Sequence, residues 1–104
     1  MIYDMRTYTV HPGKTREYLE IYERDALPVQ LEHLGNLIGY FTSEVGPLNK
    51  IVHIWAYESW TDREKRREQM WSDPRFNEAA KKLYPLIQAQ EDVILKGTRF
   101  SPLR

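Results

Sequence analysis

The 104-residue sequence contains no cysteine. This absence excludes disulfide bonds, thiolate nucleophiles and thiolate zinc sites together, and it is consistent with a reducing compartment. An excess of charge of one sign is also missing, because fifteen basic residues balance fifteen acidic ones. A neutral chain gives no electrostatic support for nucleic-acid binding, and the one basic run, 63–67, is interrupted by Glu64. We therefore expect no nucleic-acid partner.

Long apolar stretches are lacking as well. The longest ones are far too short to span a bilayer. The N-terminal residues 1–6 enter strand-like sequence at once, without the apolar core of a signal peptide or an Arg- and Ser-rich presequence. We therefore expect a cytoplasmic protein with no membrane partner. The length suits a single domain over residues 1–104.

Strand-like and helical patterns alternate along the chain. Segments rich in β-branched and aromatic residues predict four strands, at 2–10, 36–45, 50–58 and about 88–97. Apolar residues at helical spacing predict one helix from about Lys14 to Leu34, with a kink or break near Leu27 caused by Pro28. A second helix, capped at Ser59 or Thr61, should break before Asp73-Pro74 and restart there, ending near Pro85. The order β-α-β-β-α-β predicts an α+β, ferredoxin-like fold, with a four-stranded antiparallel sheet and its helices on one face.

The third predicted strand bears on the assembly of the protein. A sheet that meets water on one face should alternate apolar and polar residues, but residues 51–57 are largely apolar or aromatic at both parities. An exposed face of this kind would form an apolar patch too large for a monomer. The simplest cover is the same face of a second copy, so we predict a two-fold homodimer. The alternative is that the C-terminal tail folds over the sheet.

A hairpin loop at 46–49 suggests a register for the two middle strands. That register pairs Thr42 with His53, Tyr40 with Trp55, and Ile38 with Tyr57. One face of the hairpin then carries a polar and aromatic set: Tyr40, Thr42, Glu44, His53, Trp55 and Tyr57. A slip of one residue would move one strand's set to the other side.

The polar and aromatic face is the one group of residues with chemical content. In this fold the first strand lies beside the third, so Arg6 and Tyr8 can approach His53. We predict His53 as a proton-transfer group near neutral pH and Arg6 as the holder of a carboxylate or enolate-like oxygen. The predicted ligand-binding residues are Tyr8 and Tyr40 as hydrogen-bond donors, Trp55 as a stacking surface for a planar ligand, and Glu44 and Tyr57 beside them. The alternative is structural: His53 as a hydrogen-bonded core residue, and Arg6 paired with Asp4, Glu44 or an acid of a partner chain.

Other kinds of site have weaker support. His11, His33 and His53 lie on three different elements without ligand spacing, so we expect no metal. Axial haem ligation by His33 is a further alternative, but we expect no cofactor. No serine has a base at a recognisable spacing, and no glycine-rich phosphate loop follows a strand.

Several strings in the sequence resemble one family. The opening 3–14, the hairpin 39–49 (Gly-Tyr-Phe-Thr-Ser-Glu-Val-Gly-Pro-Leu-Asn), the strand 52–59 and the ending 100–104 are similar to the NIPSNAP domain. The resemblance implies a dimeric α+β barrel. It implies no catalytic residues, because the family has no established set. Animal members are mitochondrial and carry further sequence, so we expect this chain to be a single-domain microbial version without their adaptor roles.

Two functions follow from these observations as hypotheses. The wider barrel superfamily includes cofactor-free monooxygenases, haem-degrading enzymes, isomerases and stress-response barrels, among which fold alone does not choose. The first hypothesis is a barrel that binds or converts a small planar or aromatic metabolite, most specifically as a cofactor-free monooxygenase. The alternative is a non-catalytic dimeric interaction or regulatory module whose polar and aromatic face is the subunit interface. A cavity of roughly 300 Å³ beside His53 would favour the first.

Overall fold

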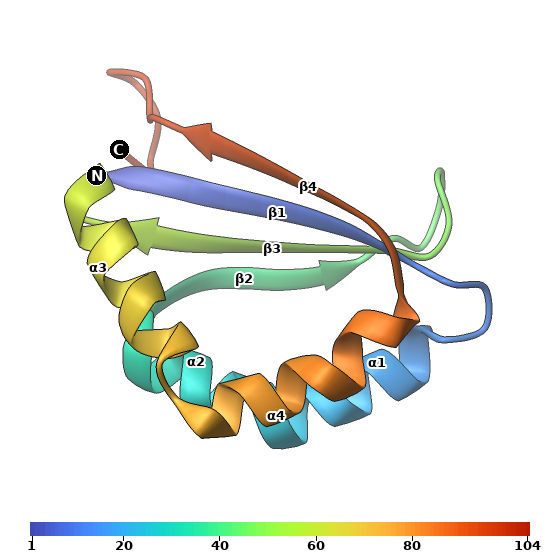
Figure 1. The fold of residues 1–104 in the computed structure, drawn as a ribbon. Coiled ribbons are helices and arrows are strands. Elements are labelled where there is room, and N and C mark those ends of the chain that lie inside the picture. The colour runs from blue at the N-terminus through green and yellow to red at the C-terminus, as the bar shows by residue number, and fades with distance from the viewer.

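The computed structural model describes all residues, 1–104, and contains one antiparallel sheet with its helices gathered on one face (Figure 1). The strand order is β2-β3-β1-β4. The strands are β1 (Ile2–Val10), β2 (Asn36–Thr42), β3 (Lys50–Tyr57) and β4 (Ile87–Leu95). This arrangement confirms the predicted α+β, ferredoxin-like fold, and β1 lies beside β3 as expected.

The first helical region is continuous but changes its winding. It consists of α1 (Thr15–Ile21), the π-helix η1 (Tyr22–Ala26) and α2 (Leu27–His33). Pro28 stands in the first turn of α2, where its missing N–H is tolerated. In an unbroken α-helix its ring would clash with the carbonyl of residue 24. The wider turn of the π-helix provides room for the ring, so the helical region changes its winding directly before Leu27 and does not break.

The second helical region is broken in two, as predicted. Helix α3 (Trp60–Trp71) begins at Ser59, whose Oγ accepts a hydrogen bond from the Asp62 backbone N at 3.1 Å. Helix α4 (Pro74–Leu83) begins at Asp73, whose Oδ1 accepts from the Arg75 backbone N at 2.9 Å, and a short 3₁₀ turn, η2 (Tyr84–Leu86), follows it. None of the helices is both long enough and apolar enough to cross a bilayer.

The hairpin register differs from the predicted one by two residues. Tyr40 lies opposite His53 and Thr42 opposite Ile51, because β2 ends at Thr42 and the connection 43–49 is longer than a four-residue loop. Gly46 and Asn49 in this connection adopt positive φ angles of 97° and 61°. A two-residue shift leaves Tyr40 and Thr42 on their predicted face, whereas the bulge between Leu37 and Gly39 places Leu37 opposite Trp55. Tyr40 and His53 therefore still share a face.

The two faces of the sheet have different surroundings. The helix-facing side chains form the core together with α1, η1, α2 and α4, and Val10, Ile51 and Trp55 are fully buried there. The opposite face has no helix over it, and Phe41 and Val93 on that face remain 55% and 43% exposed. The sequence predicted one bare apolar face, and the structure identifies it as the face away from His53.

Candidate functional site

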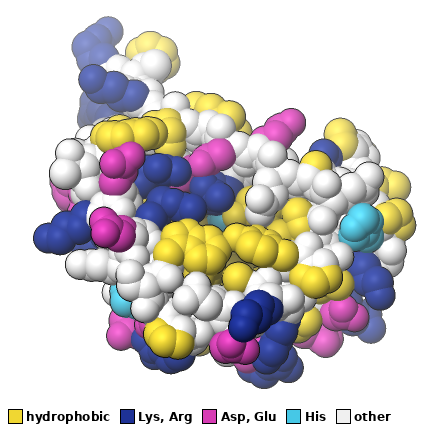
Figure 2. All heavy atoms as spheres, in the orientation of Figure 1, with side chains coloured by type: hydrophobic (Ala, Val, Ile, Leu, Met, Phe, Trp, Pro, Cys, Tyr) yellow, Lys and Arg dark blue, Asp and Glu magenta, His cyan; other side chains and the backbone are white.

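A cavity of about 70 Å³ lies between the helix-facing side of the sheet and helices α3 and α4. Its polar end is formed by Arg6, Tyr8 and His53 from the sheet, Arg67 from α3 and Gln90 from β4. Its other walls are mostly apolar and include Met70, Trp71, Phe76, Leu83 and Tyr84. Figure 2 shows basic side chains gathered in a hollow between α3 and β4, next to apolar side chains on the α4 side. The cavity thus combines a cationic end with an apolar end.

His53 stands at the polar end in one defined protonation state. The Trp55 Nε1–H donates to His53 Nδ1 at 2.9 Å, and an indole nitrogen can only donate, so Nδ1 is unprotonated. The proton of the neutral ring is therefore on Nε2, which is buried and has no partner. Burial, followed by the charge of Arg6, lowers the pKa of His53 to about 3. At neutral pH the side chain is a hydrogen-bond donor and not a proton acceptor.

Aromatic rings hold His53 in place. Tyr40 stacks on the imidazole at a centroid distance of 4.6 Å and an interplanar angle of 18°. Tyr8 meets the same ring edge-on at 4.9 Å. Both neighbouring rings and the Trp55 hydrogen bond lie in the core, so they fix the orientation of the imidazole.

Charged side chains beside His53 form what we call the cavity cluster: Asp4, Arg6, Arg63, Arg67 and Asp92. The Arg6 guanidinium lies 2.7 Å from Asp92 and 3.5 Å from Asp4, and its Nε donates to the Tyr8 hydroxyl at 3.1 Å. Arg63 Nε donates to Asp4 at 3.0 Å, and its Nη2 donates to Asp92 at 3.1 Å. Arg67 makes no hydrogen bond and no ion pair. Three guanidinium groups therefore face two carboxyl groups.

The two carboxyl groups differ in their tendency to ionise. Burial, with a contribution from neighbouring Asp92, raises the pKa of Asp4. Partial burial of Asp92 works in the same direction, but the Asp4 carboxyl and the three guanidinium groups outweigh it, so the pKa of Asp92 lies below its usual value. With at most two negative charges against three positive ones, the cavity cluster carries a net positive charge.

Arg67 is the group at which this excess charge is concentrated. It is half-buried, and burial, followed by repulsion from Arg6 and Arg63, lowers its pKa. An anionic oxygen in the cavity would supply the missing counter-charge through a charge-assisted hydrogen bond. No group of three His, Asp or Glu side chains is arranged as a metal site would need.

The structure brings some of the predicted site residues together and separates others. Arg6, Tyr8 and His53 all line the cavity, and Arg6 pairs with Asp4 and Asp92. Tyr40 lies behind His53, outside the cavity lining, with a buried hydroxyl that has no partner.

Three predicted ligand-binding residues do not reach the cavity. Trp55 and Tyr57 are fully buried and do not line it, so the role of Trp55 as a stacking surface is wrong and its actual role is to orient His53. Glu44 lies exposed in the connection 43–49, beyond the end of β2. The polar and aromatic face is covered by the chain's own helices, so its interpretation as a subunit interface is also wrong.

Sequence reasoning missed the contribution of α3. The basic run 63–67 was considered only for nucleic-acid binding, and no site residue was predicted in it, whereas Arg63 and Arg67 turn inward. A signal was present: Arg63, Arg67 and Trp71 are spaced four residues apart and therefore share one helix face.

Comparisons with known proteins place these features in a family context. The sequence profile of the NIPSNAP family matches residues 3–102. Protein NipSnap of Drosophila melanogaster is 35% identical over 101 residues, which cover 97% of this chain and 36% of that protein. The chain spans between 19% and 36% of the length of three such animal relatives.

Solved structures also relate this chain to the NIPSNAP family. Protein Atu4242 from Agrobacterium tumefaciens is 45% identical and superposes with a TM-score of 0.97, with 100% of both chains covered. An antibiotic biosynthesis monooxygenase is only 13% identical, with a TM-score of 0.68 over 94% of this chain and 99% of that one. At that identity the likeness shows a shared fold and nothing about activity.

Proposed function

We propose a function for this chain, which belongs to the NIPSNAP family: it binds a small molecule that carries a carboxylate. The resemblance predicted from its sequence strings is confirmed at the family level. The observation that carries the proposal is Arg67, a half-buried guanidinium without a counter-charge in the wall of a cavity. An uncompensated charge of this kind costs stability in the empty protein, and a bound anion would remove that cost.

The cavity suggests how such a ligand is oriented. Its carboxylate would pair with Arg67, an oxygen would accept a hydrogen bond from the Nε2–H of His53, and its carbon chain would lie against Trp71 and Phe76. Guanidinium and carboxylate pair with two parallel hydrogen bonds, which fixes the ligand's direction as well as its position. The mixed polar and apolar lining is typical of small-molecule sites.

The volume limits what the cavity can hold as it stands. About 70 Å³ corresponds to roughly five water-sized groups, at ~10–15 Å³ each. A four-carbon acid such as butanoate is of this size. The cavity is well below the roughly 300 Å³ expected for a planar aromatic metabolite, so we propose a smaller polar head group in its place.

Binding is better supported than oxygenation. A cofactor-free monooxygenase needs a base to draw a proton from its substrate. His53 is not such a base at neutral pH, because its Nδ1 is occupied by Trp55 and its Nε2 already carries a proton. The Asp4 and Asp92 carboxyl groups do not line the cavity.

The binding proposal is tested by comparing three molecules of one size. In thermal-shift titrations we expect butanoate to raise the melting temperature in a dose-dependent way, because ligand binding to the folded state alone stabilises it. Butan-1-ol and butylammonium, which lack the negative charge, should produce no shift at the same concentrations. Equal responses to all three molecules, or no response to butanoate, would contradict the proposal.

We further propose that the protein is a homodimer formed through the bare sheet face. Phe41, Val93 and Leu95 on that face are 55%, 43% and 40% exposed, and large apolar side chains exposed together often mark a protein–protein contact. The alternative cover, the C-terminal tail, reaches only one corner, where Leu103 approaches Tyr3. In Figure 1 the tail and the β2–β3 connection both project to the side of this face.

The dimer is tested at the centre of the bare face. Val52, which pairs with Thr7 in the middle of the sheet, would become Glu. Size-exclusion chromatography with light scattering should give a dimer for the native protein and a monomer for Val52→Glu. Gln69→Glu, an exposed position on α3, is the matched control and should remain dimeric. A native protein that runs as a monomer would refute the proposal.

A further inference from the structure

A second hollow lies beyond the cavity, at the other edge of the sheet. This groove has a volume of about 340 Å³ and is lined by Leu19, Tyr22, Glu23, Leu27, Leu37 and Tyr40. It lies between the first helical region and the edge strand β2, whereas the cavity lies on the side of β1 and β4. The Tyr22 side chain lines both spaces. One side chain therefore stands between the cationic cavity and an apolar groove.

We propose that Tyr22 is a gate, and that the ligand is a carboxylic acid whose apolar chain passes Tyr22 and lies in the groove. This inference rests on the proposed function, because it places the carboxylate at Arg67. It also explains the small size of the cavity. The head-group cavity of about 70 Å³ is far below the usual range of roughly 300–1,000 Å³, and the adjoining open groove of about 340 Å³ supplies the missing room.

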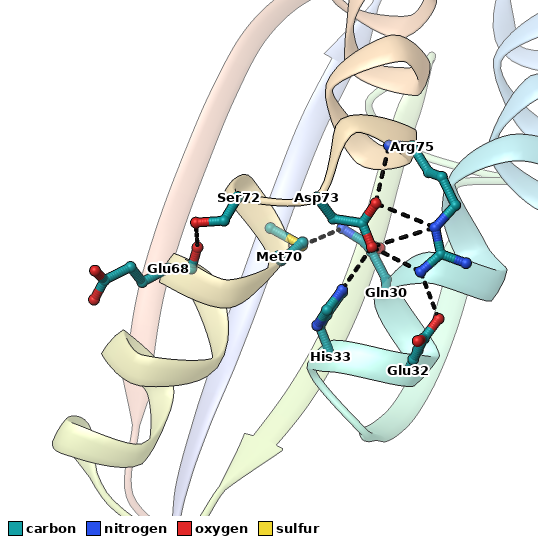
Figure 3. A network of polar contacts seen from close by, with 8 residues as sticks. All are labelled: Gln30, Glu32, His33, Glu68, Met70, Ser72, Asp73 and Arg75. Carbon is teal, nitrogen blue, oxygen red and sulfur yellow. Dashed lines mark hydrogen bonds and ion pairs between the residues drawn. The ribbon is translucent and has the colours of Figure 1, made fainter.

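Two hydrogen bonds among residues of the cavity wall hold Tyr22 in the closed position, and we call this set of three residues the latch. The Tyr22 hydroxyl donates to Gln30 Oε1, and Gln30 Nε2 donates to the Met70 sulfur at 3.7 Å; Figure 3 shows the contact between Gln30 and Met70. Gln30 and Met70 both line the cavity. A ligand that enters the cavity therefore meets all three members of the latch, and it can release Tyr22 by competing for Gln30.

The backbone at the gate is suited to rearrangement. Tyr22 is the first residue of the π-helix, a winding that is rare and often found at functional sites. The neighbouring Tyr40, with its ring centroid 4.6 Å from that of Tyr22, has a buried hydroxyl that the closed state leaves without a partner. Buried polar groups are normally satisfied, so this hydroxyl can take a hydrogen-bond partner when Tyr22 moves.

The charged residues at the two ends determine which end of the ligand lies in the groove and which in the cavity. The groove contains one charged residue, the acidic Glu23, and no basic residue. A carboxylate would be repelled there and attracted at the opposite end, where Arg67 has no counter-charge. The apolar end of the ligand belongs in the groove beside Leu27 and Leu37.

The test compares two acids that differ only in chain length, by methyl NMR on the native protein. Butanoate fits the cavity, whereas octanoate does not and must extend past Tyr22. We expect octanoate to shift the methyl signals of Leu19, Leu27 and Leu37, and butanoate to leave them unchanged. Leu95, on the bare face of the sheet, is the control for non-specific apolar binding. Shifts confined to Leu95, or equal shifts with both acids, would overturn the inference.

Affinity measurements on variants provide a second readout. Each buried methylene contributes up to ~fourfold in affinity, so octanoate should bind at least tenfold more tightly than butanoate. Leu37→Gln should remove most of this difference and leave butanoate binding unchanged, whereas Leu31→Gln, on the exposed side of α2, should alter neither. Tyr22→Phe breaks the latch but keeps the ring, so it should strengthen octanoate binding a fewfold.

The two proposals fail in different ways. If butanoate binds in an Arg67-dependent manner but octanoate binds no more tightly, the gate is refuted and the head-group site stands. If neither acid binds, the proposed function itself is refuted, and the gate with it.

Discussion

Two clusters in this molecule pair arginine with carboxylate side chains but differ in the balance of their charges. The first joins α2 to the start of α4 and is shown in Figure 3: His33 Nε2 lies 2.9 Å from Asp73, and Arg75 lies 2.7 Å from both Asp73 and Glu32. We call it the junction network. Each of its charged groups has an opposite partner, whereas the cavity cluster leaves Arg67 without one.

The difference indicates how charge is used in each place. The junction network lies mostly at the surface and is complete, so it needs no further group and serves to fix helices against each other. The cavity cluster is more deeply placed, positively charged and incomplete, in a location where an unpaired charge is costly. In our proposal a bound carboxylate completes this arrangement. The following predictions test this comparison, from the largest expected effect to the smallest.

The largest effect should be the pH dependence of stability caused by His53. Its pKa of about 3 in the folded protein lies below ~6.5, the value expected when it is unfolded, so below pH 6.5 the unfolded chain binds a proton that the folded chain does not. The free energy of unfolding should therefore fall as the pH drops. From pH 6.5 to 5 we expect a loss of about 1.5 kcal/mol. Urea unfolding at both pH values should show this loss in the native protein but not in His53→Gln; equal losses would contradict it.

Breaking the junction network should affect stability alone. Asp73→Ala removes the cap of α4 and the partner of both His33 and Arg75. We expect the melting temperature to fall by roughly 5 °C, the scale of a lost helix cap in a domain of this size. Butanoate affinity should be unchanged, as measured by calorimetry below the melting range. A loss of affinity would show that the two clusters are coupled.

Removing the unpaired charge of Arg67 should not lower stability, in contrast to breaking the junction network. Arg67→Leu relieves the repulsion with Arg6 and Arg63, so stability in the absence of ligand should stay the same or rise by up to about 1 kcal/mol. Chemical unfolding measures this difference. A clear loss of stability would mean that Arg67 has a structural partner, and that the cavity cluster is not incomplete.

The smallest effect should come from the outer edge of the junction network. Glu32 and Arg75 have side chains 57% and 58% exposed, and exposed ion pairs contribute little. Glu32→Gln should change the melting temperature by less than about 2 °C. A larger change would show that the network depends on this pair more than its exposure suggests.

The sequence was informative about the fold because the fold depends on local patterns. Strand composition, the Asp73-Pro74 restart and the Ser59 cap are signals within a few residues, and each led to an element near its observed bounds. The register of the β2–β3 hairpin, in contrast, is not determined by a signal within a few residues. It depends on a bulge between Leu37 and Gly39 and on a seven-residue connection, neither of which has a clear sequence marker.

The site was harder to predict because it depends on which way side chains face. Arg6, Tyr8 and His53 were found from strand parity and the order of strands, which survive a two-residue shift in register. Arg67 was missed because its spacing with Arg63 and Trp71 shows that the three share one helix face, but not that this face docks on the sheet. Trp55 was placed on the right face of the sheet but given the wrong role. The alternation of side chains along a strand shows which face a residue is on, but not how deeply it is buried.

The most direct test of the account is a calorimetric titration of butanoate into three proteins: the native chain, Arg67→Leu and Arg16→Gln. Arg16 is an exposed arginine on α1, far in sequence from the cavity cluster, so its loss removes the same charge without touching the site. A hydrogen bond to a charged group contributes ~1.5–3 kcal/mol, so we predict that Arg67→Leu weakens binding by roughly tenfold to a hundredfold. Arg16→Gln should bind as the native protein does. Equal affinity in all three proteins would contradict the claim that the unpaired guanidinium in the cavity is where the ligand binds.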